Sequence, residues 1–357
     1  MLKFLHLSLL LLGAFCGSVA RAESVLFLNP GSTEEAFWVS YSQFMQAAAR
    51  DLGVELQILY SQRQPDLTVA QARVALQGPE RPDYLIFVNE HYVAPQILRL
   101  AQDSGVKLFM VNAGLTADQQ ALVGDRADRV GSLVPNDEEG GYLMMKELIR
   151  LHPAVVRGEK IEVLAFSGLK ITPSAQLREL GMQRALAEHP QVRLRQLVYS
   201  GWTQQRAYEQ AKQLVSRYPQ VSLVWSANDE MAFGAMRAFA EAGKVPGKDA
   251  LFSAVNTSPA ALQALVDGRL SALVGGHFTL GGWALVQVHD DAQGVDLEQH
   301  GGRDRQLPLL QLIDKAHARK LLAMGAAPNY GVNFRQLSAK GRPASYRYAF
   351  DLQTLMR

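Results

Sequence analysis

The stretch PQVSLVWSANDEMAFGAMRAFAEA, residues 219–242, decides the fold of this chain of 357 residues. It begins with an apolar run at 221–225 and passes through Asn228 and Asp229 into a segment with the hydrophobic spacing of a helix. This pattern predicts a buried strand followed at once by a helix. In open α/β sheets, ligands bind at the carboxyl ends of the strands, where helix N-termini and loop side chains converge. The stretch therefore predicts a small-molecule site at the edge of a parallel sheet.

Strand-like and helix-like segments alternate on both sides of this stretch. The predicted strands are 24–28, 54–60, 84–88, 107–111, 161–166, 192–199, 221–225, 251–255 and 270–275. Helix-patterned segments separate them, which is typical of a parallel sheet with helices on both faces. The polar segment 299–306 is predicted to be a surface loop. Because the chain is too long for one ordinary core, we expect an α/β protein with two doubly wound lobes.

Residues 1–22 have the pattern of a secretory signal peptide. Lys3 supplies a positive charge, 4–15 form a short apolar run, and 20–22 is a small-x-small cleavage signal. This run is shorter than the roughly 20 residues that a membrane-spanning helix needs. We therefore expect cleavage after Ala22 and release into the periplasm, without insertion into the membrane.

The only cysteine, Cys16, lies inside this leader. A lipoprotein anchor at Cys16 is the less favoured alternative, because the bulky Phe15 precedes it where a small residue is expected. With cleavage after Ala22, the mature chain would have neither disulfides nor thiol chemistry. Loss of Lys3 and Arg21 would lower Lys+Arg from 36 to 34, equal to the 34 Asp+Glu. This neutral balance argues against nucleic acid or an anionic membrane surface as the main partner.

Asparagines follow three of the predicted strands. The amide of Asn228 can donate and accept hydrogen bonds at once. Asp229 is a second candidate for ligand contact, and the alternative is that it is simply the N-cap of the next helix. Asn112 and Asn256 occupy similar strand ends, although each alone could be a turn-former. His277 also follows a strand, at a predicted crossing between lobes. Together these residues predict a polar ligand site.

Three aromatic residues stand at similar turns. Phe37 and Trp38 open the first helix, and because two adjacent rings cannot both face one core stripe, we expect one to project into the crevice. The alternative is that both pack at the helix start. Trp202 directly follows a strand, where an indole can stack on a ligand ring, as in many sugar sites. A surface-packed role for Trp202 is equally compatible with the sequence.

The sequence contains none of the common catalytic motifs that we sought. It has no phosphate-binding loop, no dinucleotide fingerprint, no nucleophile elbow and no Cys/His cluster for a metal. We therefore predict a protein that is not an enzyme and uses neither a cofactor nor a metal. The alternative, a carbohydrate-processing enzyme, would need two carboxylates converging in the cleft. Asp229, Glu35 and Glu90 are the available candidates.

The chain resembles the type I periplasmic binding proteins, the ribose-binding and autoinducer-receptor superfamily. The most specific match is 228–235, and weaker ones occur at 36–40, 130–131 with 139–141, 178–181 and 261–270. The resemblance implies two Rossmann-like lobes joined by a three-crossing hinge that closes on ligand. The implied division is 23–134 plus 277–307 for the N-terminal lobe, and 135–276 plus 308–357 for the C-terminal lobe and tail.

The resemblance also implies roles for the candidate residues. Phe37, Trp38 and Trp202 fall on positions whose rings sandwich the ligand in sugar-binding members, and Asn228 and Asn256 fall on polar contact positions. The remaining candidates for the ligand site are Asp229, Asn112 and His277.

The chain also departs from the family pattern. Asn112 and Ala113 stand where sugar binders carry Asp-Arg, and Leu180 stands where an Arg is expected before the glycine of a second-lobe helix. Near the last crossing, Gly276 replaces a polar residue. Because charge-assisted hydrogen bonds would be replaced by amides, we predict an amide-rich, aromatic pocket that a common pyranose or ribose fits poorly.

The function implied is that of a periplasmic solute-binding protein. It would capture a small polar, sugar-like ligand in the interlobe cleft and present it to an inner-membrane ABC transporter. The alternative is a receptor that docks on a membrane sensor, a histidine kinase or cyclase, in signalling. Asn112 and the segment 84–87 resemble the autoinducer receptor and favour this alternative. The long tail 309–355 is a candidate docking element, although a strand added to the second lobe is equally compatible with it.

Overall fold

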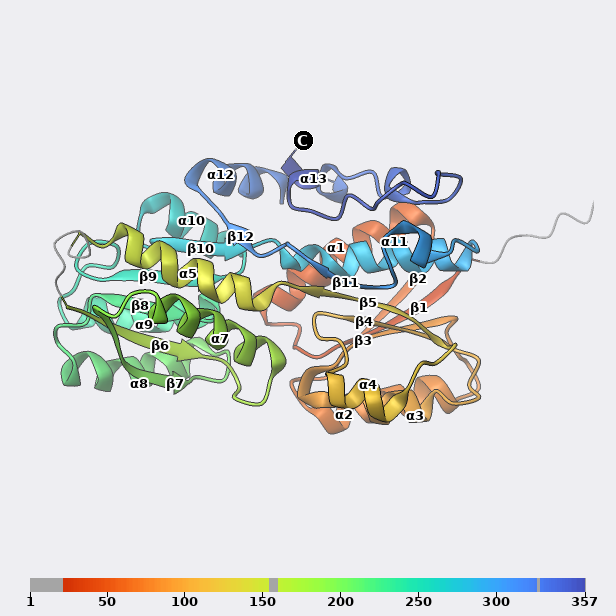
Figure 1. Ribbon diagram of the computed structural model, residues 1–357, viewed down its shortest axis with the longest axis horizontal. Coiled ribbons are helices and arrows are strands. Elements are labelled where there is room, and N and C mark those ends of the chain that lie inside the picture. The colour runs from red at the N-terminus through yellow and green to blue at the C-terminus, as the bar shows by residue number, and fades with distance from the viewer. Residues whose placement is uncertain (1–21, 154–159, 326–327, 357) are drawn as a thin grey trace, which may run out of the picture.

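The computed structural model describes residues 22–153, 160–325 and 328–356. Nearly all of the predicted signal peptide therefore lies outside the described residues. The described chain forms two α/β lobes, each built on a six-stranded sheet, as Figure 1 shows. None of the described helices is both long enough and apolar enough to cross a membrane.

The first lobe has a parallel sheet in the order β11-β5-β4-β3-β1-β2. Its strands are β1 Ser24–Asn29, β2 Glu55–Tyr60, β3 Tyr84–Val88, β4 Lys107–Val111, β5 Arg129–Pro135 and β11 Asp304–Leu307. Its helices are α1 Ala36–Leu52, α2 Pro65–Gln77, α3 Ala94–Leu100, α4 Ala117–Val123 and α11 Leu280–Ala292. Helices α1 and α11 cover one face of the sheet and α2 and α3 the other (Figure 1).

The second lobe has the order β12-β10-β9-β8-β6-β7, in which only the short β12 is antiparallel to its neighbour. Its strands are β6 Ile161–Ser167, β7 Val192–Tyr199, β8 Leu223–Ser226, β9 Leu251–Val255, β10 Ala272–Gly275 and β12 Gln311–Leu312. Its helices are α5 Asp137–Leu151, α7 Pro173–Ala187, α8 Gln204–Arg217, α9 Asp229–Glu241 and α10 Pro259–Asp267. Strand β8 and helix α9 confirm the strand and helix predicted from residues 219–242.

Strands β5 and β11 were not predicted, and they pair with each other at the edge of the first sheet. The polar sequence of β11, Asp-Arg-Gln-Leu, led to the prediction of a surface loop at 299–306, which is wrong at its end. An edge strand needs little apolar character because one side faces solvent. Gly131 and Ser132 interrupt the apolar run of β5, and Gly131 lies so close to β11 that a Cβ there would be 2.2 Å from the Arg303 carbonyl oxygen.

The chain crosses between the lobes three times, after β5, after β10 and between β11 and β12. The crossings are held side by side. The Asn136 side-chain oxygen accepts a hydrogen bond from Leu310 N at 2.9 Å. Gly276 has φ of 124°, and a Cβ at this position would lie 2.4 Å from the Leu309 carbonyl oxygen. Only glycine suits both the backbone angle and the close approach, so Gly276 brings two of the crossings together.

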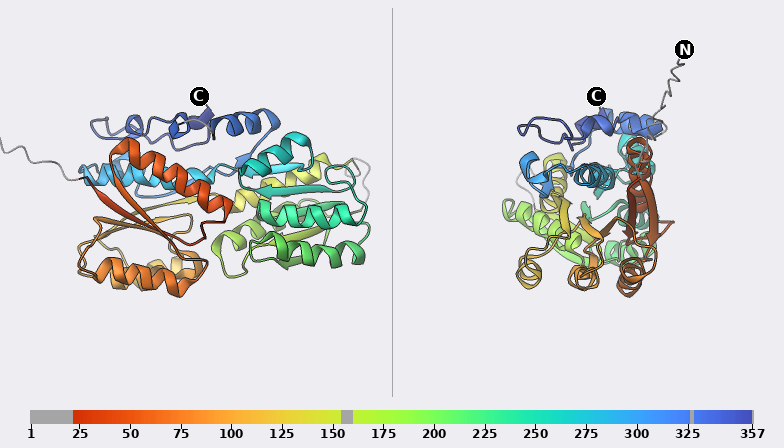
Figure 2. Two further views of the ribbon diagram at one scale, coloured as in Figure 1. Left: turned by 180° about the vertical axis from the view of Figure 1, so that it is seen from behind. Right: turned by 90° about the vertical axis from the view of Figure 1, so that its right-hand side faces the viewer.

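The tail that follows β12 contacts both lobes. Helix α12, Lys315–Met324, packs on α10 of the second lobe. Further along, the Phe334 ring lies 5.3 Å from the Phe44 ring of α1, and the Phe350 ring stacks 5.4 Å from the Trp283 ring of α11. Figures 1 and 2 show the tail lying along one side of both lobes. The prediction that the whole of 308–357 belongs with the second lobe is therefore wrong for its middle part.

A buried carboxylate anchors this middle part of the tail. Asp290 of α11 is fully buried and accepts hydrogen bonds from Ala339 N at 2.6 Å, from the Tyr348 hydroxyl at 2.8 Å and from the Ser338 hydroxyl. A buried carboxylate is costly unless hydrogen bonds compensate it. Asp290 therefore holds the tail in a single place on the first lobe.

Candidate functional site

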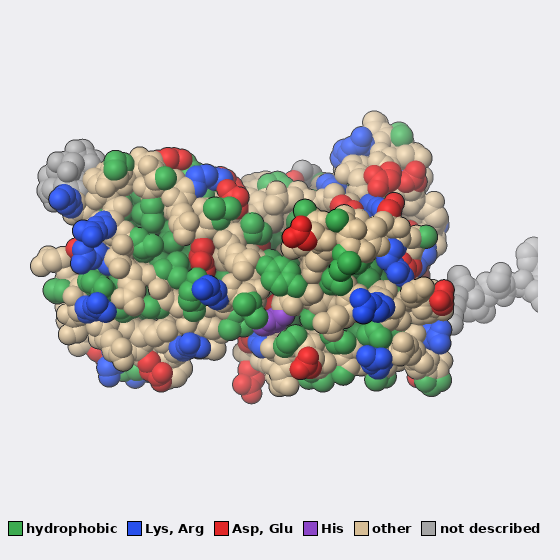
Figure 3. Space-filling model, turned by 60° about the horizontal axis from the view of Figure 1, so that its bottom comes forward, with side chains coloured by type: hydrophobic (Ala, Val, Ile, Leu, Met, Phe, Trp, Pro, Cys, Tyr) green, Lys and Arg blue, Asp and Glu red, His purple; other side chains and the backbone are tan. Residues whose placement is uncertain are grey.

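A cavity of about 480 Å³ lies between the lobes, at the carboxyl ends of the parallel strands of both sheets. Figure 3 shows the two lobes meeting near the middle of the face turned away from the tail, with hydrophobic, charged and histidine side chains at the junction. Every residue proposed from the sequence for ligand contact lines this cavity: Phe37, Trp38, Asn112, Trp202, Asn228, Asp229, Asn256 and His277.

The start of α1 supplies both aromatic residues of the first lobe. Phe37 is half-buried and stacks on His277 with ring centres 4.5 Å apart. Trp38 is buried and packs so closely over Gly31 that a Cβ on this glycine would lie 2.1 Å from the indole Cδ1. We expected one ring to face the crevice, whereas both line it. The Trp38 indole Nε1 has no hydrogen-bond partner within the described chain.

Trp202 is the counterpart in the second lobe. It follows β7 with φ of 68°, and its ring lies against Gly168, where a Cβ would be 2.1 Å from the indole. The Arg178 guanidinium lies 5.8 Å from its ring centre, as Arg63 lies 5.8 Å from the ring of Trp38. Each lobe therefore lines the cavity with one tryptophan and one arginine beside it.

Asn228, and not Asp229, is the N-cap of α9. Its side-chain oxygen accepts from Met231 N at 2.9 Å, and its amide nitrogen donates to the Trp202 carbonyl oxygen at 3.0 Å. Both the donor and the acceptor of this amide are therefore used within the protein. Asn228 holds Trp202 in place, so it affects the cavity through the tryptophan as well as by lining it.

Asp229 and Asn256 are tied together at the wall of the cavity. The Asp229 carboxylate accepts from the Asn256 amide at 2.7 Å and from the Ser258 hydroxyl at 2.5 Å. Burial raises the pKa of Asp229. Asn112, in contrast, has φ of 64°, is 9% exposed, and has a buried side-chain oxygen without a partner among the residues described. Among these predicted candidates, Asn112 thus has a side-chain acceptor that the described chain leaves unpaired.

Two arginines, which the sequence analysis missed, also line the cavity. Arg178 donates from Nε to Asp137 at 2.7 Å and from Nη1 to the Ala227 carbonyl oxygen at 2.7 Å. The prediction that amides replace the arginines of the pocket is therefore wrong. Residues 178–181 match the family pattern and include Arg178. The sequence analysis placed the expected arginine at Leu180, which lies outside the cavity.

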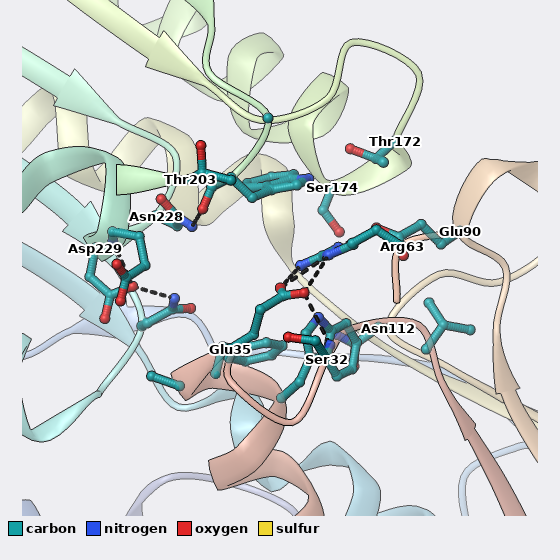
Figure 4. A pocket seen from close by; sticks show the side chains of 18 of the residues that line it. Ser32, Glu35, Arg63, Glu90, Asn112, Thr172, Ser174, Thr203, Asn228 and Asp229 are labelled. Atoms are coloured by element: carbon teal, nitrogen blue, oxygen red, sulfur yellow. Dashed lines mark hydrogen bonds and ion pairs between the residues drawn. The ribbon is translucent and has the colours of Figure 1, made fainter. Parts of the chain in front are cut away.

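Arg63 follows β2 and joins two carboxylates of the first lobe. Its guanidinium lies 2.5 Å from Glu35 and 2.5 Å from Glu90, as the dashed lines in Figure 4 show. In this view the three side chains lie across the cavity from Asn228 and Asp229 of the second lobe. The second oxygen of Glu90, Oε2, is buried and accepts no hydrogen bond from the described residues.

His277 lies at the second crossing, fully enclosed. Its Nε2 is 3.4 Å from Nη2 of Arg178. Because a guanidinium only donates, the neutral ring must accept at Nε2 and carry its proton on Nδ1. Nδ1 has no partner in the part of the chain that is described. Burial, and then the charge of Arg178, holds the pKa of His277 well below its usual range.

This depressed pKa predicts a pH-dependent contribution of His277 to stability. In the folded protein the ring stays neutral, whereas in the unfolded chain it titrates near a pKa of about 6.5. The unfolded state therefore binds the additional proton as the pH falls, and the stabilisation present above about pH 6.5 is lost below it. Between pH 7.5 and 5.5 the free-energy difference between the wild type and His277→Asn should shift against the wild type by about 1.4 kcal/mol. Urea unfolding of both proteins at the two pH values measures this free-energy difference. A difference that stays the same at both pH values would contradict the prediction.

A family model described as a periplasmic binding protein domain matches residues 25–294. The chain belongs to this family. The family resemblance and the two-lobed fold expected from the sequence are thereby confirmed.

Curated relatives of this periplasmic binding protein include a ribose import binding protein of Salmonella typhimurium. It is 26% identical over 273 residues, covering 74% of this chain and 82% of the relative. A D-apiose import binding protein of Actinobacillus succinogenes is 24% identical, covering 63% and 67%.

Solved structures give a similar result. A periplasmic sugar-binding protein from Pseudomonas fluorescens is 62% identical, with a TM-score of 0.88 and coverage of 94% of this chain and 99% of that chain. A galactofuranose binding protein is 19% identical with a TM-score of 0.73, covering 86% and 100%, and supports the fold alone.

Proposed function

We propose that this protein is a periplasmic solute-binding protein that captures a sugar or sugar-like polyol between its lobes and delivers it to an inner-membrane ABC importer. The observation that carries the proposal is the pair of tryptophans, Trp38 from the first lobe and Trp202 from the second, lining one cavity. The apolar face of a sugar ring stacks on an indole. Closure of the hinge would bring both lobes onto the ligand.

The unpaired polar groups of the cavity suit a polyhydroxyl ligand. Trp38 Nε1, Trp202 Nε1 and His277 Nδ1 are donors without partners in the described chain, and Asn112 Oδ1 and Glu90 Oε2 are acceptors without them. Each buried unpaired group costs about 1–3 kcal/mol. Because a hydroxyl both donates and accepts, a sugar can satisfy both kinds of group at once.

The charges around the cavity favour an uncharged ligand. Five acidic residues line it, Glu34, Glu35, Glu90, Asp229 and Glu230, against two arginines, Arg63 and Arg178. An excess of negative charge repels phosphates and carboxylates. We therefore propose a neutral sugar or polyol as the ligand.

The names of the relatives favour import over signalling. The Salmonella relative is named for ribose import and the Actinobacillus relative for D-apiose import. A pull-down from detergent-solubilised membranes tests this part of the proposal. Recovery of an ABC permease is expected, and recovery of a sensor kinase or cyclase ectodomain in its place would favour the alternative.

Replacing Trp202 by alanine should weaken ligand binding. The stacking contact and the Nε1 donor would both be lost, at a cost of about 1–3 kcal/mol, or about 5- to 150-fold in Kd. Calorimetry measures the Kd of both proteins, with a neutral pentose, hexose or polyol that binds the wild type as the ligand. Tyr208→Ala, a half-buried aromatic of the same lobe outside the cavity, is the matched control. Equal affinities for both variants would refute the placement of the site.

A further inference from the structure

A second cavity of about 630 Å³ adjoins the first. Asn112, Ala113 and Pro173 line both cavities, so the two are neighbours at the end of β4 and the start of α7. The first cavity alone already falls within the usual range of about 300–1,000 Å³ for a small-molecule site. The second cavity falls in the same range, and we call it the second chamber.

This second chamber has one polar and one apolar wall. The polar wall comes from β5 and β11 of the first lobe and includes Arg129, Ser132 and Gln306. The apolar wall comes from α7 of the second lobe, where Leu177 is 38% exposed and Leu180 is 50% exposed. Large apolar side chains exposed beside fixed polar groups suit the face of a sugar ring and its hydroxyls.

Unsatisfied polar atoms are found along the chamber. Asn112, at the junction, has its buried oxygen unpaired within the described chain. Arg129 is 5% exposed and donates from Nη1 to Asp304 at 2.6 Å, while its Nε has no partner among the described residues. Because these atoms are buried, the polar groups open to a ligand are those of the exposed Asp304 and Gln306 of β11.

The Arg305 side chain lies on the other face of β11, against the tail. Its guanidinium lies 5.7 Å from the Tyr348 ring centre and 5.6 Å from that of Phe350. Tyr348 in turn donates to the buried Asp290 at 2.8 Å. Burial lowers the pKa of Arg305. Because the family match ends at residue 294, the part of the wall formed by β11 comes from the chain beyond the matched domain.

We propose that the binding site takes a ligand of two units, a neutral disaccharide or a glycoside with a polar second unit. One unit would occupy the first cavity between the tryptophans. The other would lie in the second chamber, its apolar face on Leu177 and Leu180 and its hydroxyls toward Ser132 and Gln306. The proposal rests on the sugar-binding function proposed above and specifies the size class of its ligand.

The chamber also spans the contact between the lobes. The Tyr92 hydroxyl of the first lobe donates to the Gln176 side-chain oxygen of α7 at 2.8 Å, and both residues line the chamber. A second unit placed here touches both lobes beside this hydrogen bond. It therefore adds to the closing of the hinge as well as to affinity.

Calorimetry on the mature protein tests the proposal. The probes are disaccharides and methyl glycosides made from the neutral pentoses and hexoses, each compared with its own monosaccharides at equal concentration. We expect at least one two-unit probe to bind 10-fold or more tightly than either monosaccharide. Equal or tighter binding of the monosaccharides would overturn the two-unit ligand and leave the sugar-binding function intact. Absence of binding by every probe would overturn both.

Variants in the second chamber separate its contribution. Leu180→Arg should fill the chamber and raise the Kd of the two-unit probe 10-fold or more, with the Kd of its monosaccharide changed less than 2-fold. Leu177→Arg, on the same wall, should change the two Kd values in the same sense. Val245→Arg is the control, because Val245 is 52% exposed and lies outside both cavities. Circular dichroism verifies folding, and equal losses for both probes would show that the chamber takes no separate unit.

Discussion

Arg178→Met should lower the free energy of unfolding by about 3–5 kcal/mol, the usual cost of breaking a buried ion pair. The substitution leaves the carboxylate of Asp137 buried without its counter-charge, and the Ala227 carbonyl without the donor at 2.7 Å. Urea unfolding monitored by tryptophan fluorescence measures the change. Ligand affinity should fall too, because Arg178 lines the cavity beside Trp202 and His277.

Two further variants give this prediction its controls. Asp137→Leu combined with Arg178→Met removes both charges, and should recover much of the lost stability because no buried charge is left unpaired. Arg237→Met breaks the exposed pair with Glu241 and should change the stability little. A loss below about 1 kcal/mol for Arg178→Met would mean that water reaches Asp137.

Phe334→Ala should cost about 3–5 kcal/mol, the range for deleting a buried aromatic ring. The ring is fully buried between Phe44 of α1 and Trp283 of α11, 5.3 Å and 5.8 Å away between ring centres. Its loss leaves a cavity where the tail meets the first lobe. We therefore expect the tail to become sensitive to proteolysis before the lobes do.

Urea unfolding together with limited proteolysis checks this prediction. Val74→Ala, which shortens an exposed apolar side chain on α2, is the control and should change neither measurement. If Phe334→Ala unfolds like the wild type and its tail stays resistant, the ring does not hold the tail on the first lobe.

The strand and helix in residues 219–242 could be predicted because their pattern is local. An apolar run and a helical period are each complete within a few residues. The convergence of the eight candidate residues follows from the same pattern, since the carboxyl ends of parallel strands meet at one edge. Asn112, Asn256 and Trp202 all line the cavity for this reason.

The partners of these residues could not be predicted in the same way. Whether Asn228 or Asp229 caps α9 depends on where the helix begins, and sequence patterns place helix ends only to within one or two residues. Arg63 follows β2 in a segment without any distinguishing motif. Its role depends on Glu90, a residue of the neighbouring crossover that folding brings to 2.5 Å.

The sequence by itself therefore determined the alternation of strands and helices, the family, and the sheet edge that carries the cavity. Periodicity, turn residues and the motif at 228–235 act over short distances along the chain. Only the tertiary structure decided which polar groups are satisfied, where the tail lies, and that a second chamber adjoins the first. These features depend on contacts such as that between Asp290 and Tyr348, 58 residues apart, and no local pattern specifies such a contact.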